Sequence, residues 1–204
     1  MPFFSHKKSS PEEIVTEAVD QLKDLLANKS KPSDKNKAET TADAAIGTLN
    51  SKLNDANTSF DAVAQLCHLI YTHDLILLLV KSLPLVGFET RKDITNIMGF
   101  LVRRQVGSSM PTVEYIVDKA NETVFELLKM FENRDCSQAV GLMLRDMAKF
   151  PPICQIMLSS PHFFDFFRLI VHPIFDIATD CFLTFHVEFY NKTGYTVAAS
   201  PALC

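Results

Sequence analysis

Apolar side chains recur at intervals of three and four residues along most of the chain, which is the spacing that lines one face of an α-helix. The first such segment follows Ser10 and Pro11, a favourable N-cap and first-turn pair, and two glutamates then suit the positive end of the helix dipole. We therefore predict an amphipathic helix over residues 10–27. The polar, proline-containing residues 28–37 are predicted to form a loop.

The same reasoning predicts ten further helices, most of them separated by proline, glycine or polar residues. Their expected ranges are 38–53, 60–71, 73–83, 89–104, 111–120, 121–131, 134–150, 151–158, 161–171 and 173–190. The last helix carries an aromatic stripe that consists of Phe175, Ala178, Phe182, Phe185 and Phe189. We expect this stripe to pack, with Phe175 in the first turn able to project past it, and polar residues such as Asp176 and Thr184 to lie on other sides. The alternative for Phe182, Phe185 and Phe189 is that they are partly exposed or covered by the tail, because a following repeat is missing.

Three of these helices begin a similar pattern at Asp93, Cys136 and Asp176, which are 43 and 40 residues apart. HEAT and armadillo arrays repeat at about 40–47 residues, with two or three helices in each unit. The order of two short helices and one longer helix is also repeated. The predicted fold class is therefore all-α, an armadillo/HEAT-like helical-repeat solenoid, and the alternative is a globular helix bundle.

The composition argues against some classes of function but does not identify one. The 204 residues are 47% hydrophobic with six glycines, and the net charge of −4 argues against a nucleic-acid partner. Five scattered cysteines without a Cys-x-x-Cys pair suit reduced thiols in the cytoplasm, most of them in the core. The longest apolar run, Leu75 to Val80, is too short to span a membrane.

Patterns for catalysis, metal binding and cofactor binding are missing from the sequence. His68 and His73 are five residues apart, which does not suit two metal ligands on one helix face, and no phosphate-binding glycine motif is present. Cys154 is the one candidate nucleophile, but apolar neighbours would raise the pKa of its thiol, so we expect it in the core. We predict a protein that is not an enzyme, with no cofactor, metal or small-molecule substrate.

Arginines recur late in the predicted helices, at Arg103, Arg104, Arg145 and Arg168. A guanidinium group donates two parallel hydrogen bonds to a carboxylate, so these residues could form a charged rim that binds a partner. The alternative is that each caps the C-terminus of its helix and is solvated.

Several long stretches resemble the Mo25 family, also called the calcium-binding protein 39 family. They are LVRRQVGSSMPTVEYI (101–116), GLMLRDM (141–147), FFDFFR (163–168), FDIATDCFLTF (175–185) and the N-terminal PEEIV (11–15). The resemblance covers roughly residues 1–186 and fades after Phe185. Despite the family's second name, no Asp-x-Asp-x-Asp-Gly loop is present, so calcium binding is not expected.

The resemblance implies a scaffold that activates protein kinases without catalysis of its own. Family members bind the STRAD pseudokinase in a closed conformation, assemble with liver kinase B, and activate germinal-centre kinases. The phenylalanine that opens the Phe-Asp-Ile-Ala motif contacts the kinase from the concave face, and it matches Phe175. The predicted partner-binding residues are therefore Phe175 and Asp176, together with Arg103, Arg104 and Arg145. The alternative for Phe175 is packing against Phe166 or Phe167.

Family members continue for more than a hundred further residues, so the resemblance implies a truncated array. A helical-repeat fragment that binds partners without activating them is the alternative function. We predict a flexible N-terminus over residues 1–9, a repeat domain over residues 10–190, and a disordered tail over residues 191–204.

Overall fold

The computed structural model describes residues 9–27 and 32–186. The described residues form eleven α-helices and two short 3-10 helices. Among these residues there is no β-strand, and the only β-type pairing is an isolated bridge between Val106 and Ser109. The predicted all-α class is confirmed. The predicted limits of the two termini, residues 1–9 and 191–204, lie almost entirely outside the described part, and all three domain limits stay predictions.

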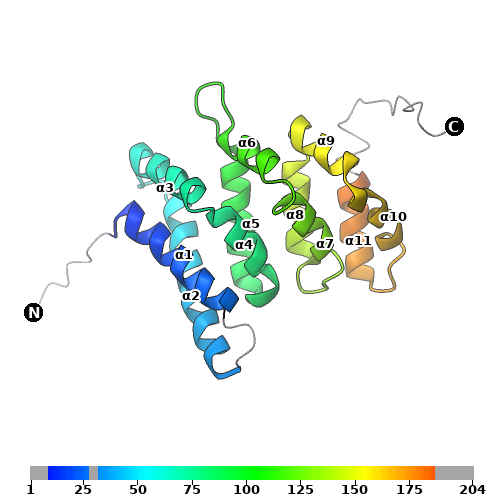
Figure 1. Ribbon diagram of the computed structural model, residues 1–204, viewed down its shortest axis with the longest axis horizontal. Helices are drawn as coiled ribbons and strands as arrows, with labels where there is room; N and C mark the ends of the chain where they lie inside the picture. Colours follow the sequence, from blue (N-terminus) through cyan, green and yellow to red (C-terminus); the bar gives the residue numbers. More distant parts are fainter. Residues whose placement is uncertain (1–8, 28–31, 187–204) are drawn as a thin grey trace, which may run out of the picture. The chain divides into compact units, whose positions relative to one another are not determined.

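The chain divides into two compact units, residues 1–112 and 113–204. The helices of the first unit, labelled in Figure 1, are α1 (Pro11–Ala27), α2 (Pro32–Asn54), α3 (Phe60–Thr72), α4 (Leu75–Ser82), η1 (Leu83–Leu85) and α5 (Phe88–Arg103). Within this unit α1 packs against α2, α3 and α4, and α2 packs against α5.

The expected start of α1 is confirmed in detail. The Glu13 backbone N–H donates to Ser10 Oγ at 3.2 Å, and the Ser10 backbone N–H donates to Glu13 Oε2 at 2.9 Å. This reciprocal pair is a capping box, and it satisfies two backbone donors that the helix itself leaves unpaired. The buried face of α1 then runs from Ile14 to Leu25.

The prediction of a loop over residues 28–37 is wrong from Pro32 onward, because α2 begins there. Proline suits the first turn of a helix, where its missing N–H has no partner to lose. Ala38 is buried, and the residues of α2 before it are polar apart from Pro32, so the sequence lacks an apolar pattern there. Farther along, Asn50 Nδ2 donates to Asp93 Oδ1 at 2.7 Å and Thr90 Oγ1 donates to Asp43 Oδ1 at 2.7 Å, which links α2 to α5.

Two further expectations for the first unit need correction. The predicted helix over residues 73–83 begins at Leu75, because Asp74 adopts a left-handed conformation with φ of 51°. The apolar pattern that predicts the helix over residues 60–71 includes Phe60, but this residue is 76% exposed instead of packed. Its ring lies 5.5 Å from the Arg104 guanidinium, in a cation–π contact.

The second unit contains most of α6 (Pro111–Asp118), then α7 (Val124–Met130), α8 (Ser137–Met147), α9 (Pro151–Ser159), η2 (Pro161–Phe164), α10 (Asp165–Leu169) and α11 (Phe175–Thr184). In this unit α8 packs between α7 and α11, and α10 packs on α11. Two short helices precede a longer one in both α6–α8 and α9–α11, as the sequence predicts (Figure 1).

The core of the second unit includes several fully buried residues from these helices, among them Phe131, Val140, Leu144, Phe166 and Ile177. Cys154 is also buried, so its predicted place in the core is confirmed, and so is that of Cys67, Cys136 and Cys181. No single helix of the described residues has the length and hydrophobicity of a membrane span. The helices α3 and α4–η1 together reach that length and hydrophobicity, but they are bent by 73° relative to each other.

Candidate partner-binding site

The start of α11 places Phe175 and Asp176 at the surface of the second unit. The residue before the helix, Ile174, is extended, and its backbone N–H donates to His172 Nδ1 at 3.1 Å. The helix is held from its other side by three buried residues, Ile177, Cys181 and Thr184.

Cys181 serves packing rather than chemistry. Burial raises the pKa of its thiol to about 12, so the thiolate needed for nucleophilic attack or metal binding is scarce near neutral pH. The thiol instead donates to the Phe166 carbonyl oxygen at 3.6 Å, which ties α11 to α10.

The aromatic stripe predicted for this helix is not its buried face. Phe175 is 79% exposed and Phe182 is 49% exposed, while Phe189 lies outside the described residues. The stripe prediction followed the spacing of three and four residues between the aromatic positions. The structure instead buries the smaller residues at 177, 181 and 184, which share a different face.

Phe175 is too exposed to serve mainly as a packing residue, so the alternative of packing against Phe166 or Phe167 is wrong. Those two rings lie in another cluster, where Phe166 is 6.3 Å from Phe163 and Phe167 is 5.4 Å from Phe185, centroid to centroid. The ring of Phe175 therefore lies at the surface, on the side of α11 away from its buried residues.

Asp176 faces a cation from the loop before α8. Its Oδ2 atom is 4.0 Å from Arg134 Nη2, and both side chains are more than half exposed. A pair of this kind is worth about 0–1 kcal/mol, so it leaves the Asp176 carboxylate available to an incoming cation at little cost.

Arg145 lies in the last turn of α8 and reaches α11. Its Nη1 atom donates to Thr184 Oγ1 at 2.9 Å and to the Asp180 carbonyl oxygen at 3.4 Å. Burial raises the pKa of the Asp180 carboxyl, the Arg145 charge opposes this shift, and the Asp176 charge adds to it.

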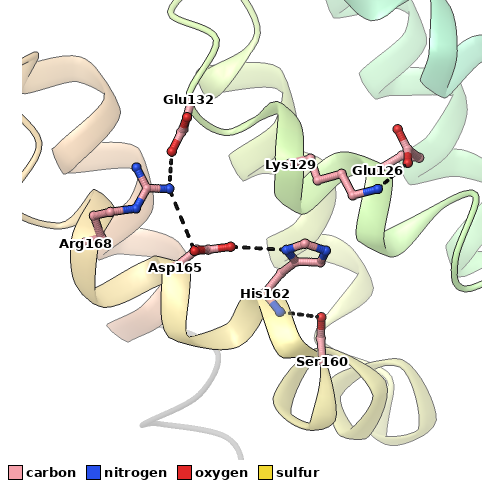
Figure 2. A network of polar contacts seen from close by, with 7 residues as sticks. All are labelled: Glu126, Lys129, Glu132, Ser160, His162, Asp165 and Arg168. Atoms are coloured by element: carbon pink, nitrogen blue, oxygen red, sulfur yellow. Dashed lines mark hydrogen bonds and ion pairs between the residues drawn. The ribbon is translucent and has the colours of Figure 1, made fainter.

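Arg168, the fourth arginine of the predicted rim, is held by acidic residues of the same unit. Figure 2 shows its guanidinium between Glu132 and Asp165, with Nη2 3.7 Å from Asp165 Oδ1. Asp165 also pairs with His162 Nδ1 at 3.1 Å, and the His162 backbone N–H donates to Ser160 Oγ at 3.1 Å. These contacts connect η2 and α10 to the residues after α7. They explain the position of the Arg168 side chain by contacts within the chain, with no need for a bound partner protein.

Arg103 and Arg104 belong to the first unit, at the end of α5. Arg103 is exposed in the last turn, and Arg104 is half-buried over the Phe60 ring. Both positions agree with the predicted placement of cations at helix C-termini. Among the side chains that the structure describes, no three histidines, cysteines or carboxylates gather where they could hold a metal ion.

Comparison with protein families decides the relationship. A family model described as Mo25-like matches residues 2–197, which is nearly the whole chain. The chain belongs to the Mo25-like family. This family has an armadillo-like helical-repeat fold, so the predicted fold class is confirmed beyond its all-α character.

Individual relatives support the same assignment. The chain is 37% identical over 186 residues to calcium-binding protein 39-like from Mus musculus, and equally to the protein of that name from Homo sapiens. It is 30% identical over 191 residues to MO25-like protein 2 from Caenorhabditis elegans. These alignments cover 90–91% of this chain and 55–56% of the relatives, so the chain spans about half the length of the curated relatives it matches.

In this Mo25-like chain the structure brings three of the five predicted partner-binding residues onto one helix pair. Phe175 and Asp176 begin α11, and Arg145 reaches the same helix from α8. Sequence reasoning overlooked Arg134, which pairs with Asp176, and the exposed side chains of Leu142 and Leu183. The exposure of Phe182 agrees with the alternative given for the stripe, and Phe182 shares a helix face with Phe175 because the two residues are seven apart.

Proposed function

We propose that this protein is a non-catalytic scaffold that binds protein kinases or pseudokinases through the second unit, with Phe175 as the main anchor. The observation that carries the proposal is an aromatic ring that is 79% exposed at the start of a helix whose opposite face is buried. The resemblance implies that the matching phenylalanine of Mo25 relatives contacts a kinase, and family membership supports extending that role to this chain.

Activation by such a scaffold needs no proton transfer. A kinase that exchanges between inactive and active conformations shifts toward the active one if the scaffold binds that conformation more tightly. Each difference of about 1.4 kcal/mol in binding free energy changes the ratio of the two conformations tenfold. The candidate partners are a STRAD-like pseudokinase, which would then assemble with liver kinase B, and germinal-centre kinases.

The direct test measures binding of the full chain to a purified STRAD-like pseudokinase and to a germinal-centre kinase. Truncation of an aromatic anchor commonly costs about 2 kcal/mol or more, so Phe175→Ala should weaken binding by about 30-fold. Phe164→Ala is the matched control, because it removes an equally large and similarly exposed ring from η2. Equal affinity of the wild-type chain and the Phe175→Ala variant would refute Phe175 as the anchor.

A second candidate function is partner binding without activation. Exposure of Phe175 supports contact with a partner but does not by itself supply a preference for the active kinase conformation. Adding the chain to a reconstituted kinase assay separates the two functions. A rise in kinase activity supports the activating scaffold, whereas loss of the activity that a full-length relative induces supports a competing binder.

A further inference from the structure

The guanidinium of Arg145 occupies a space on the surface of α8 on its way to α11. A solvated arginine would not need such a space. Gly141 lies one turn before Arg145 on the same helix. A Cβ atom at position 141 would lie 2.9 Å from Arg145 Nη1, 3.3 Å from Thr184 Oγ1 and 3.5 Å from Phe131 Cζ. The absence of a side chain at Gly141 therefore leaves room for the guanidinium to pass across α8 to α11.

The acceptors of Arg145 are themselves fixed. Thr184 is fully buried, and its hydroxyl donates to the Asp180 carbonyl oxygen at 2.8 Å while it accepts from Arg145. The same carbonyl lies 3.4 Å from Arg145 Nη1. Both hydrogen bonds come from Nη1 and reach polar atoms of residues 180 and 184, so they join α8 to two successive turns of α11 and restrain its register.

One other directional contact holds α11, the weak hydrogen bond from the Cys181 thiol to the Phe166 carbonyl oxygen at 3.6 Å. The remaining contacts of α11 constrain its position less specifically. Its buried apolar side chains contribute attraction without direction, because the hydrophobic effect is proportional to area. Near its first turn, the Arg134–Asp176 pair is exposed and weak. Phe175 precedes Thr184 by nine residues, about 14 Å along the helix, so a small rotation of α11 displaces the exposed ring.

We propose that Arg145 is a positioning residue: it fixes the register of α11 on α8, and so places Phe175 and Asp176, with Gly141 providing the room for its guanidinium. The consequence for partner binding rests on the proposed function, whereas the register of α11 does not. Burial raises the pKa of the Asp180 carboxyl, and the nearby Arg145 charge partly opposes this rise, which agrees with Arg145 lying against α11.

The first test requires no partner. Hydrogen exchange of the α11 backbone amides is measured in the full chain and in three variants. Arg145→Met removes the hydrogen bonds but keeps the alkyl stem, and Gly141→Ala keeps the arginine but occupies its space. Arg145→Lys retains one donor. We expect exchange in α11 to rise about fivefold in the first two variants and less in the third, with α1 unchanged as the internal control. Unchanged exchange of α11 in both Arg145→Met and Gly141→Ala would overturn the proposal.

The second test separates positioning from direct contact, and it uses the STRAD-like pseudokinase as the probe. A positioning residue acts through Phe175, so Arg145→Met should weaken binding about fivefold in the wild-type chain and much less when Phe175 is already alanine. Equal losses in the two backgrounds would mean that Arg145 acts independently of Phe175, and the positioning role would be rejected. If the wild-type chain binds no kinase, the proposed function fails, and hydrogen exchange alone decides the role of Arg145.

Discussion

The aromatic cluster around α10 provides a quantitative test of the packing in the second unit. Phe166 is 1% exposed, and its ring centroid lies 5.8 Å from that of Phe131 and 6.2 Å from that of Phe185. Truncating a buried phenylalanine to alanine costs about 3–5 kcal/mol, which combines lost transfer energy with a cavity. Because Phe166 has edge-to-face and tilted ring neighbours as well, we expect Phe166→Ala to lower the free energy of unfolding by about 4 kcal/mol.

Phe164, two residues earlier, supplies the control for that experiment. Its ring is 71% exposed, so Phe164→Ala removes the same atoms but should cost less than about 0.5 kcal/mol. The chain has no tryptophan, so urea unfolding is followed by far-ultraviolet circular dichroism, and hydrogen exchange of α10 and α11 localises the change. Similar destabilisation by the two substitutions would refute the reasoning, because it would show that the cost does not follow burial.

Two further predictions concern the first helix and the pH dependence of stability. Ser10→Ala should cost about 1 kcal/mol by removing half of the capping box with Glu13, whereas Ser9→Ala should have almost no effect in the same urea titration. Burial raises the pKa of the Asp180 carboxyl in the folded state, so its contribution to stability is complete below the unfolded pKa and is lost as pH rises through the folded pKa. Asp180→Asn should therefore raise the melting temperature relative to the wild-type chain at neutral pH, and this difference should shrink on acidification; a constant difference from pH 7 to pH 3 would contradict the assignment.

Local signals in the sequence predict helix starts better than helix faces. Ser10 and Pro11 define the beginning of α1, because capping depends on residues adjacent in the chain. The beginning of α2 at Pro32 was missed although it uses the same proline preference, because the following residues are too polar to suggest a packed helix. Tertiary contacts from Ala38 onward stabilise α2, and the sequence does not show how far the helix extends before them.

The face of α11 illustrates a limit of a different kind. A hydrophobic pattern records that a side chain avoids water, but it does not state whether the same chain or another molecule covers it. Phe175 and Ile177 are both apolar and two residues apart, yet one is exposed and the other is fully buried. Periodicity alone chose the larger aromatic set as the core. The packed face was instead set by Cys181 and Thr184, which fit closely against α10 and α8.

Arg145 shows how a prediction of residue type can be right about position and incomplete about role. The sequence placed it late in a helix with a planar fork of donors, and the structure directs those donors into the protein, toward Thr184 and Asp180. A surface contact and an internal bridge use the same chemistry, so the residue itself does not distinguish them. The distinguishing residue is Gly141, because a helix interior disfavours glycine by about 1 kcal/mol relative to alanine and the guanidinium needs the space that glycine leaves. In this chain Gly141 leaves the space through which Arg145 joins α8 to α11, the helix that carries the exposed Phe175.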